Sequence, residues 1–301
     1  MSQILGVQVF SVYRELFEDY LGTLRRIAHA GYEAVELLSH NFAAGVRFSD
    51  LYPAKELKAR LREWNLAPVS SHEIMTQGKD VLHDYDWDAI MRYSVELECP
   101  RVVIPWQWFL EREDTLRTAE KLDALGKRMR SHGLELYYHH HAHEFIPVGD
   151  TTAFELLLDN IDPAHLKVQL ETAFVQLVGL DPAAFAERLG GRCDMVHQTD
   201  LGGTAGFRAE AFFDELLELR RSGKDIMDAY MGMFRSSIRS TDLGAGDFDF
   251  ERFYERMGRI GGLKYVIVEN ETDGEGKVES IERDCRFMRH HINRIAEERN
   301  V

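Results

Sequence analysis

The chain has 301 residues, of which 45% are hydrophobic and 29% charged, and its formal net charge is -15. This composition is typical of a globular protein that buries a large core, and the length suits two small domains or one barrel. The charge disfavours nucleic acid as a partner, and the absence of a long apolar run or a basic leader predicts neither membrane span nor signal peptide, with cytoplasm as the expected location.

Eight short apolar runs in chain order are typical of buried parallel strands, and we expect them at Ile4–Phe10, Ala34–Leu38, Ala67–Ser71, Val102–Trp106, Leu134–His139, Leu166–Leu170, Met195–Gln198 and Tyr265–Val268. Segments with helical spacing lie between them, for example Tyr20–Ala30, Ala54–Trp64, Trp87–Leu97, Thr115–Arg130 and Phe250–Met257. Alternation at intervals of roughly 30 residues indicates βαβ units. Eight units without a dividing linker predict an α/β fold, a single (β/α)8 TIM-barrel domain over 1–301.

One interval between strands is unusually long. Residues 201–241 separate the seventh and eighth predicted strands, and Phe207–Arg221 and Lys224–Phe234 within them have helical patterns. Because this helical insertion leaves the C-terminal rim of the barrel, we expect either a lid or a contact with a second subunit, so a homo-oligomer or another subunit is an expected partner. A decorative surface excursion is the alternative. The cysteines Cys99, Cys193 and Cys285 are widely spaced and odd in number, which predicts buried thiols.

The segment Leu134–Phe145, LELYYHHHAHEF, contains four histidines and a glutamate, which are residue types that bind metals or transfer protons. It is expected to be one strand that runs into a loop, so His139, His141 and possibly His143 would share a face, with Glu144 just beyond. Buried or solvated histidines without a function are the alternative. The ends of other strands add Glu171, His197, Asp200, Glu269 and Glu271. In a barrel these ends converge, and several carboxylates in one pocket repel each other unless a cation neutralises them.

Each carboxylate also has a structural alternative. Glu171 could cap the helix that follows it, and Glu269 could pair with Arg239 at the rim. A site rich in carboxylates with one or two imidazoles suits Mn²⁺, Mg²⁺, Co²⁺ or Fe²⁺ better than a structural zinc.

Several motifs in order resemble one known family. They are GVQVFSV at Gly6, GYEAVEL at Gly31, YHHHAHEF at Tyr138, LETAFVQLVGLDP at Leu170, VHQTD at Val196, LGAGDFDF at Leu243 and VIVENE at Val266. Together they resemble the sugar phosphate isomerase/epimerase superfamily, the xylose isomerase-like TIM barrels. The resemblance implies a divalent metal, with Mn²⁺ expected first, held by Glu144, Glu171, His197 and Glu269.

Four positions depart from the usual pattern of this family. Relatives often have YHNHDHEF where this chain has His140 and Ala142, Asp where it has Glu171, and the lysine of HLKD where it has Thr199. The additional methylene of Glu171 moves its carboxylate outward by roughly 1.5 Å. We expect these differences to affect the metal and the choice of substrate.

The resemblance also implies chemistry on a small sugar or glycoside. A divalent cation stabilises the enediolate of a keto sugar, and Glu144 and Glu269 would remove and return the proton. We expect His141 to be a third acid/base or hydroxyl contact, and Gln8, His72, Trp106, His139 and Arg239 to bind the substrate. The glycine turn at 243–249 carries Asp247 and Asp249, so an unphosphorylated substrate is favoured.

These expectations leave four functions open. A metal-dependent isomerase or epimerase of a keto sugar or polyol is the leading hypothesis. A lyase that cleaves 3-keto-glycosides, including C-glycosides, by elimination from the same enolate is the alternative. A nuclease for abasic DNA conflicts with the net charge, and a metal-free binding protein is the non-enzymatic possibility.

Overall fold

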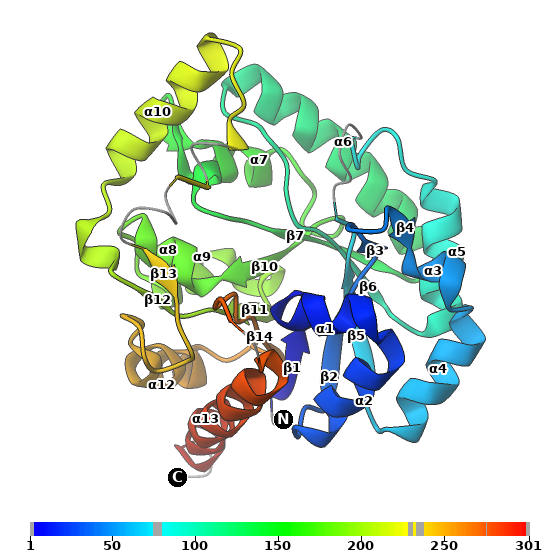
Figure 1. Ribbon diagram of the computed structural model, residues 1–301. Coiled ribbons are helices and arrows are strands. Elements are labelled where there is room, and N and C mark those ends of the chain that lie inside the picture. Colours follow the sequence, from blue (N-terminus) through cyan, green and yellow to red (C-terminus); the bar gives the residue numbers. More distant parts are fainter. Residues whose placement is uncertain (1–2, 75–79, 228–230, 233–237, 275, 299–301) are drawn as a thin grey trace.

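The computed structural model describes residues 3–74, 80–227, 231–232, 238–274 and 276–298, with side chains described up to residue 292. Eight parallel strands close into a barrel in the order β1-β14-β11-β10-β7-β6-β5-β2. Figure 1 shows the helices arranged around these strands. The predicted (β/α)8 barrel is therefore confirmed. The barrel strands are β1 (Ile4–Gln8), β2 (Ala34–Leu38), β5 (Ala67–His72), β6 (Arg101–Ile104), β7 (Glu135–His139), β10 (Lys167–Glu171), β11 (Met195–Gln198) and β14 (Tyr265–Val268).

The helices follow the strands along the chain. They are α1 (Tyr13–Glu18), α2 (Tyr20–His29), α3 (Phe48–Leu51), α4 (Ala54–Glu63), α5 (Trp87–Leu97), α6 (Arg112–Ser131), α7 (Ala153–Asp159), α8 (Thr172–Leu177), α9 (Pro182–Leu189), α10 (Ala209–Arg221), α12 (Phe250–Ile260) and α13 (Lys277–Glu298). Short 3-10 turns occur at η1 (Val9–Val12), η2 (His143–Phe145), η3 (Gly190–Arg192) and η4 (Thr204–Gly206). Among the described residues, no helix is long and apolar enough to cross a membrane.

Three two-stranded sheets decorate the barrel, and the sequence did not predict them. They are β3 (His40–Asn41) with β4 (Val46–Arg47), β8 (Pro147–Val148) with β9 (Thr151–Thr152), and β12 (Leu201–Gly202) with β13 (Arg239–Ser240). The last pair joins the two ends of the insertion. In the insertion, α10 lies within the predicted helix at 207–221, and the second predicted helix, 224–234, lies partly outside the described residues.

Two predicted strands are too long at their C-terminal ends. The first ends at Gln8 because its side chain accepts a hydrogen bond from the Phe10 amide and so begins the η1 turn. The fourth ends at Ile104, so Trp106 lies in the loop after β6. Both changes move side chains from the strand into the loops at the C-terminal rim, where barrels of this kind build their sites.

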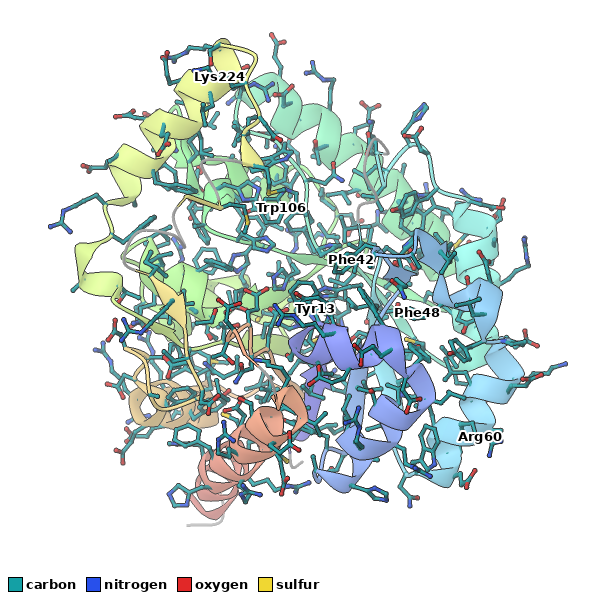
Figure 2. All side chains as sticks on the ribbon, viewed as in Figure 1. Tyr13, Phe42, Phe48, Arg60, Trp106 and Lys224 are labelled. Carbon is teal, nitrogen blue, oxygen red and sulfur yellow. The ribbon has the colours of Figure 1, made fainter. Side chains whose placement is uncertain are left out.

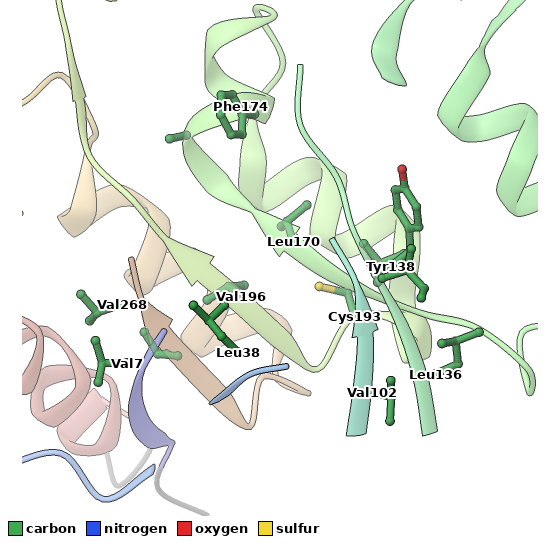
Figure 3. Close-up of a cluster of buried hydrophobic side chains, with 14 of the residues drawn as sticks. Val7, Leu38, Val102, Leu136, Tyr138, Leu170, Phe174, Cys193, Val196 and Val268 are labelled. Atoms are coloured by element: carbon green, nitrogen blue, oxygen red, sulfur yellow. The ribbon is translucent and has the colours of Figure 1, made fainter. Parts of the chain in front are cut away.

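The apolar core lies mainly between the strands and the surrounding helices. Figure 3 shows part of it, including Val7, Val196 and Val268 from the neighbouring strands β1, β11 and β14. The barrel interior has a separate small apolar layer of Ala34, Val69, Val103, Tyr137, Met195 and Ile267. Cys99, Cys193 and Cys285 are buried free thiols, as predicted.

Candidate active site and metal centre

Four metal-ligating side chains meet where β7, β10, β11 and β14 end. The ligand atoms of His139, Glu171, His197 and Glu269 all lie within 4.8 Å of one another. Strand register brings them together, because Gln169 pairs with His139 across β10 and β7, and Glu171 pairs with His197 across β10 and β11. Glu171, His197 and Glu269 belong to the predicted ligand set. His139, predicted as a substrate contact, takes the fourth place in this group instead of Glu144.

The electrostatics of this group indicate a need for positive charge. Burial, and then the charge of Glu269, raise the pKa of Glu171 to about 8, although His197 opposes the shift. Glu271 is exposed as a residue, yet the pKa of its carboxyl is raised to about 8 by desolvation and by the charges of Glu269 and Glu171. Burial and neighbouring imidazoles lower the pKa of His139 well below its usual range, so this ring is neutral.

The donor set fits a divalent cation. Two carboxylates and two imidazoles supply mixed oxygen and nitrogen ligands, which suit Mn²⁺, Fe²⁺, Co²⁺ or Zn²⁺. The Nδ1 atom of His197 lies 3.1 Å from Glu269 Oε2 and 3.9 Å from Glu171 Oε2. A cation between these atoms would take the place of the proton that the raised pKa leaves on Glu171.

Glu144, the remaining predicted ligand, lies in a neighbouring group with His141 and His143. Its carboxylate is fully buried and accepts hydrogen bonds from the Tyr138 hydroxyl at 2.9 Å and the His141 amide at 2.8 Å. Burial raises the pKa of this carboxyl to about 8. Glu144 would have to leave these partners to bind the metal, and its role as a ligand stays a prediction.

The two groups are connected through ring contacts. The rings of His139 and His141 are 4.8 Å apart, and those of His139 and His197 are 4.6 Å apart. Trp106 covers His141, with 4.2 Å between ring centroids. His141, the predicted acid/base candidate, is only partly buried, whereas Glu144 is fully buried.

Three of the departures from the family pattern are in contact with one another. The Thr199 hydroxyl donates to Glu171 Oε2 at 2.9 Å, and the Glu171 amide donates to Nε2 of His140 at 3.2 Å. The other oxygen of Glu171 accepts from the Ala173 amide at 2.9 Å, so this residue also caps α8, as the structural alternative predicted. Ala142 is fully buried nearby in the same loop as Glu144. The carboxylate of Glu171 is therefore held by the Thr199 hydroxyl and the Ala173 amide.

The predicted substrate contacts fall into two environments. Gln8, His72 and His139 are buried in the barrel interior, where Gln8 donates to Glu36 at 2.7 Å and His72 Nε2 lies 2.8 Å from Gln169 Oε1. In Figure 2, Trp106 is labelled in the loop after β6, and Tyr13 and Phe42 are labelled on α1 and the β3–β4 loop. Arg239, on β13, is exposed. Substrate binding by all five predicted residues stays a prediction.

Sequence reasoning missed Glu36, which lies at the centre of the interior polar layer. It is fully buried in β2, within the otherwise apolar segment AVELL. A single acidic residue inside a buried strand is the signal that could have identified it, because such a charge needs partners. Its carboxylate lies 2.5 Å from Nε2 of His197.

The glycine turn after the insertion is closed by Asp200. The amides of Gly244 and Gly246 each donate to Oδ2 of Asp200 at 2.9 Å, and the Phe248 amide donates to Oδ1 at 3.1 Å. These amides are the donors that such a turn would offer to a phosphate. Since a carboxylate already uses them, the turn has a structural role.

Curated relatives share parts of this chain. It is 23% identical to the inosose dehydratase of Clostridium beijerinckii over 65% of this chain and 61% of that protein. It is 28% identical to the inosose dehydratase of Bacillus velezensis over 54% of this chain and 48% of that protein. The matches thus span about half to three fifths of the length of these relatives.

Solved structures with this fold match nearly the whole chain. A sugar phosphate isomerase/epimerase from Parabacteroides distasonis has a TM-score of 0.69 at 20% identity and covers 95% of this chain and 93% of its own. The IolI protein, solved with a bound zinc atom, has a TM-score of 0.68 at 12% identity and covers 98% and 99%. The 3-keto-D-glucoside 4-epimerase of E. coli has a TM-score of 0.63 at 14% identity and covers 96% and 99%.

The family model for the xylose isomerase-like TIM barrel matches residues 24–291. This match extends from α2 to α13 and includes every side chain of the candidate metal centre. The chain therefore belongs to the xylose isomerase-like TIM barrel family.

Proposed function

We propose that this protein is a divalent-metal-dependent enzyme that removes the proton next to the carbonyl of an unphosphorylated keto sugar or related polyol, and returns it as an isomerase or epimerase. The observation that carries the proposal is the group of His139, Glu171, His197 and Glu269 at the C-terminal ends of the strands. A divalent cation held there would stabilise the negative charge that develops on the sugar oxygens.

The residues around the group supply the rest of the chemistry. Glu269 is slightly exposed, with 12% of its side chain accessible, so its carboxylate can reach a substrate proton. Burial raises the pKa of Glu144 to about 8, so this carboxyl holds a proton at neutral pH. A base at Glu269 and an acid at Glu144 would suit removal and return of a proton. His141 has a ligand atom within 4.8 Å of one of Glu144 and would pass the proton on.

An unphosphorylated substrate is supported by the charges at the mouth. Glu271 is exposed and lies near the partly exposed Glu269, and the amides of the glycine turn are bonded to Asp200. A phosphate would meet repulsion and would lack its usual donors. Manganese is the cation we expect first, with Mg²⁺, Co²⁺ or Fe²⁺ as alternatives, because carboxylates make up half of the donor set.

Exchange of a substrate C–H proton with solvent tests this function. The Mn²⁺-loaded protein is incubated in D₂O with a panel of ketoses, cyclitol ketones and 3-keto-glucosides, and deuterium incorporation is followed by NMR. We expect incorporation next to the carbonyl of at least one compound, with a loss of at least about 100-fold in Glu269→Gln. A folded, metal-loaded protein that exchanges no proton in the whole panel would refute the proposal.

Elimination is the second candidate, because the curated relatives are named as dehydratases and dehydration is an elimination. In this case the same proton abstraction is followed by departure of the group on the next carbon. The proton on Glu144 or His141 would assist the leaving group, as a hydroxyl or as the aglycone of a 3-keto-glycoside. Release of an aglycone or of water from substrates that also exchange deuterium would favour the lyase over the epimerase.

A further inference from the structure

Glu36 accepts hydrogen bonds from five side chains in the barrel interior. Its Oε1 lies 2.7 Å from Gln8 Nε2, 2.9 Å from His72 Nε2 and 2.5 Å from His197 Nε2. Its Oε2 accepts from the Ser70 hydroxyl and from Gln169 Nε2, both at 2.6 Å. A carboxylate surrounded by so many donors is an ionised acceptor, and buried charges of this kind need such complete pairing.

This arrangement decides which nitrogen of His197 carries a proton. Because the carboxylate only accepts, the Nε2 atom of His197 must be the N–H that donates to it. The other nitrogen, Nδ1, donates to Glu269 when no metal is bound, and it is the nitrogen that would give up its proton and offer a lone pair to a metal. It is also the nitrogen that faces the two carboxylates of the metal centre, at 3.1 Å from Glu269 and 3.9 Å from Glu171.

The same carboxylate orients the second imidazole through Gln169. Since Glu36 accepts, the amide group of Gln169 must turn its NH₂ end towards it, and its carbonyl oxygen must face the other way. That oxygen lies 3.1 Å from Nδ1 of His139 and 2.8 Å from Nε2 of His72. Nδ1 of His139 therefore donates to it, and the single N–H of His72 Nε2 is shared between this oxygen and Glu36 Oε1. His139 keeps Nε2 for a metal, and His72 is not free to bind one through Nε2.

We propose that Glu36 is a positioning residue that fixes, directly and through Gln169, which nitrogen of His197 and of His139 is presented to the metal. Outer partners of this kind hold the tautomer and the ring orientation of histidine ligands. The inference rests on the proposed metal centre, and it adds a role for a residue that does not touch the metal.

Metal affinity of the full chain provides the first test. Competition with a chromophoric chelator gives the Mn²⁺ and Zn²⁺ affinities of the wild type, Glu36→Gln and Glu73→Gln. Glu73 is the matched control, because it is also a buried glutamate, follows β5 and pairs with Arg47 at 2.9 Å outside the interior layer. We expect a loss of roughly 10–100-fold for Glu36→Gln. We expect less than about two-fold for Glu73→Gln.

The tautomers provide a readout that does not depend on activity. NMR of protein labelled with ¹⁵N-histidine, metal-free and zinc-loaded, should show a proton on Nε2 of His197 and on Nδ1 of His139 in the wild type. In Glu36→Gln both assignments should become mixed. In Gln169→Leu, a second variant of similar volume, only His139 should change and His197 should keep its Nε2 proton.

The outcomes separate the inference from the function on which it rests. A wild type that binds no metal refutes the proposed function, while the metal-free spectra still test the hydrogen-bond assignment. A bare Nε2 on His197 in the wild type overturns the inference. Unchanged tautomers and unchanged affinity in a folded Glu36→Gln also overturn it. If Glu36→Gln does not fold, Gln169→Leu decides. An unchanged His139 tautomer in that variant would contradict the proposal that Glu36 orients His139 through Gln169.

Discussion

At the scale of single residues, the carboxylate of Glu171 extends one methylene further than the Asp that the family pattern has here, and both of its oxygens have partners. One of its oxygens caps α8 through the Ala173 amide, and the other accepts from the Thr199 hydroxyl. The structure thus pairs two positions at which the chain departs from its family. A shorter aspartate would lose reach to Thr199, whose hydroxyl would then be buried without this acceptor.

The contact between these two residues can be measured by a double-mutant cycle. We expect Glu171→Asp and Thr199→Val each to lower the free energy of unfolding of the metal-free protein by about 1–2 kcal/mol, because each removes the same hydrogen bond. The double variant should lose about 1 kcal/mol less than the sum. Urea unfolding measures all four proteins, and costs that add within about 0.3 kcal/mol would contradict the coupling.

Residue types that bind metals could be predicted from the sequence, but their partners could not. His139, Glu171, His197 and Glu269 lie within one residue of the C-terminal end of a predicted strand, and strand ends converge in a barrel. Glu144 lies in the loop after the strand that ends at His139, yet its carboxylate turns towards Tyr138 and the His141 amide. This choice depends on the η2 turn, whose geometry comes from packing that strand periodicity does not encode.

At the scale of elements, the loop of Leu243–Phe248 depends on Asp200 at the end of β11. Three backbone amides of the loop donate to this fully buried carboxylate. A glycine at 246 is needed because a Cβ there would lie 2.2 Å from Oδ1 of Asp200. Gly246 therefore allows the backbone to approach the Asp200 side chain, and the turn does not form a phosphate site.

Removing this carboxylate should loosen the loop. We expect Asp200→Ala to destabilise the protein by about 2–4 kcal/mol, since several hydrogen bonds to a charged group are lost and the amides are left unpaired. Hydrogen exchange should quicken at Gly244, Gly246 and Phe248. If these amides exchange as fast as in the wild type, with the core amides as an internal reference, Asp200 does not hold the loop.

The helix α13 is tied to this region by Asp284. Its carboxylate accepts from the Leu243 amide at 2.9 Å and from the Asn270 side chain at 2.6 Å. Burial raises its pKa to about 6, and the charge of Asp242 contributes in the same direction. The folded protein therefore holds this proton more tightly than the unfolded chain, in which the pKa of Asp is about 3.9.

The sign of this shift gives a pH dependence of stability. The contribution of Asp284 is fully present below about pH 4 and is lost as the pH rises through about 6, by up to about 3 kcal/mol. Asp284→Asn removes the titration, so the stability of the variant relative to the wild type should rise between pH 4 and pH 7. Urea unfolding at both values measures it, and a difference that does not change with pH would contradict the shift.

At the scale of the whole molecule, the eight strands and the barrel could be predicted because apolar runs recur with the βαβ interval. The three small sheets could not, since each is a pair of two-residue strands set by the tertiary contacts of a loop. The role of Glu36 could not be predicted for the same reason. Its position inside a strand was visible, and the five donors that converge on it come from β1, β5, β10 and β11, which only the closed barrel brings together.

The proposed chemistry depends on the metal centre, so metal content tests it most directly. Mass spectrometry is applied to wild type and Glu269→Gln purified without chelator or affinity metal, with Glu120→Gln, an exposed change on α6, as the control. We expect about one Mn, Fe, Co or Mg per chain in the wild type and the control, and its loss in Glu269→Gln. A folded wild type that contains no such metal and takes up none on titration would contradict the proposed chemistry.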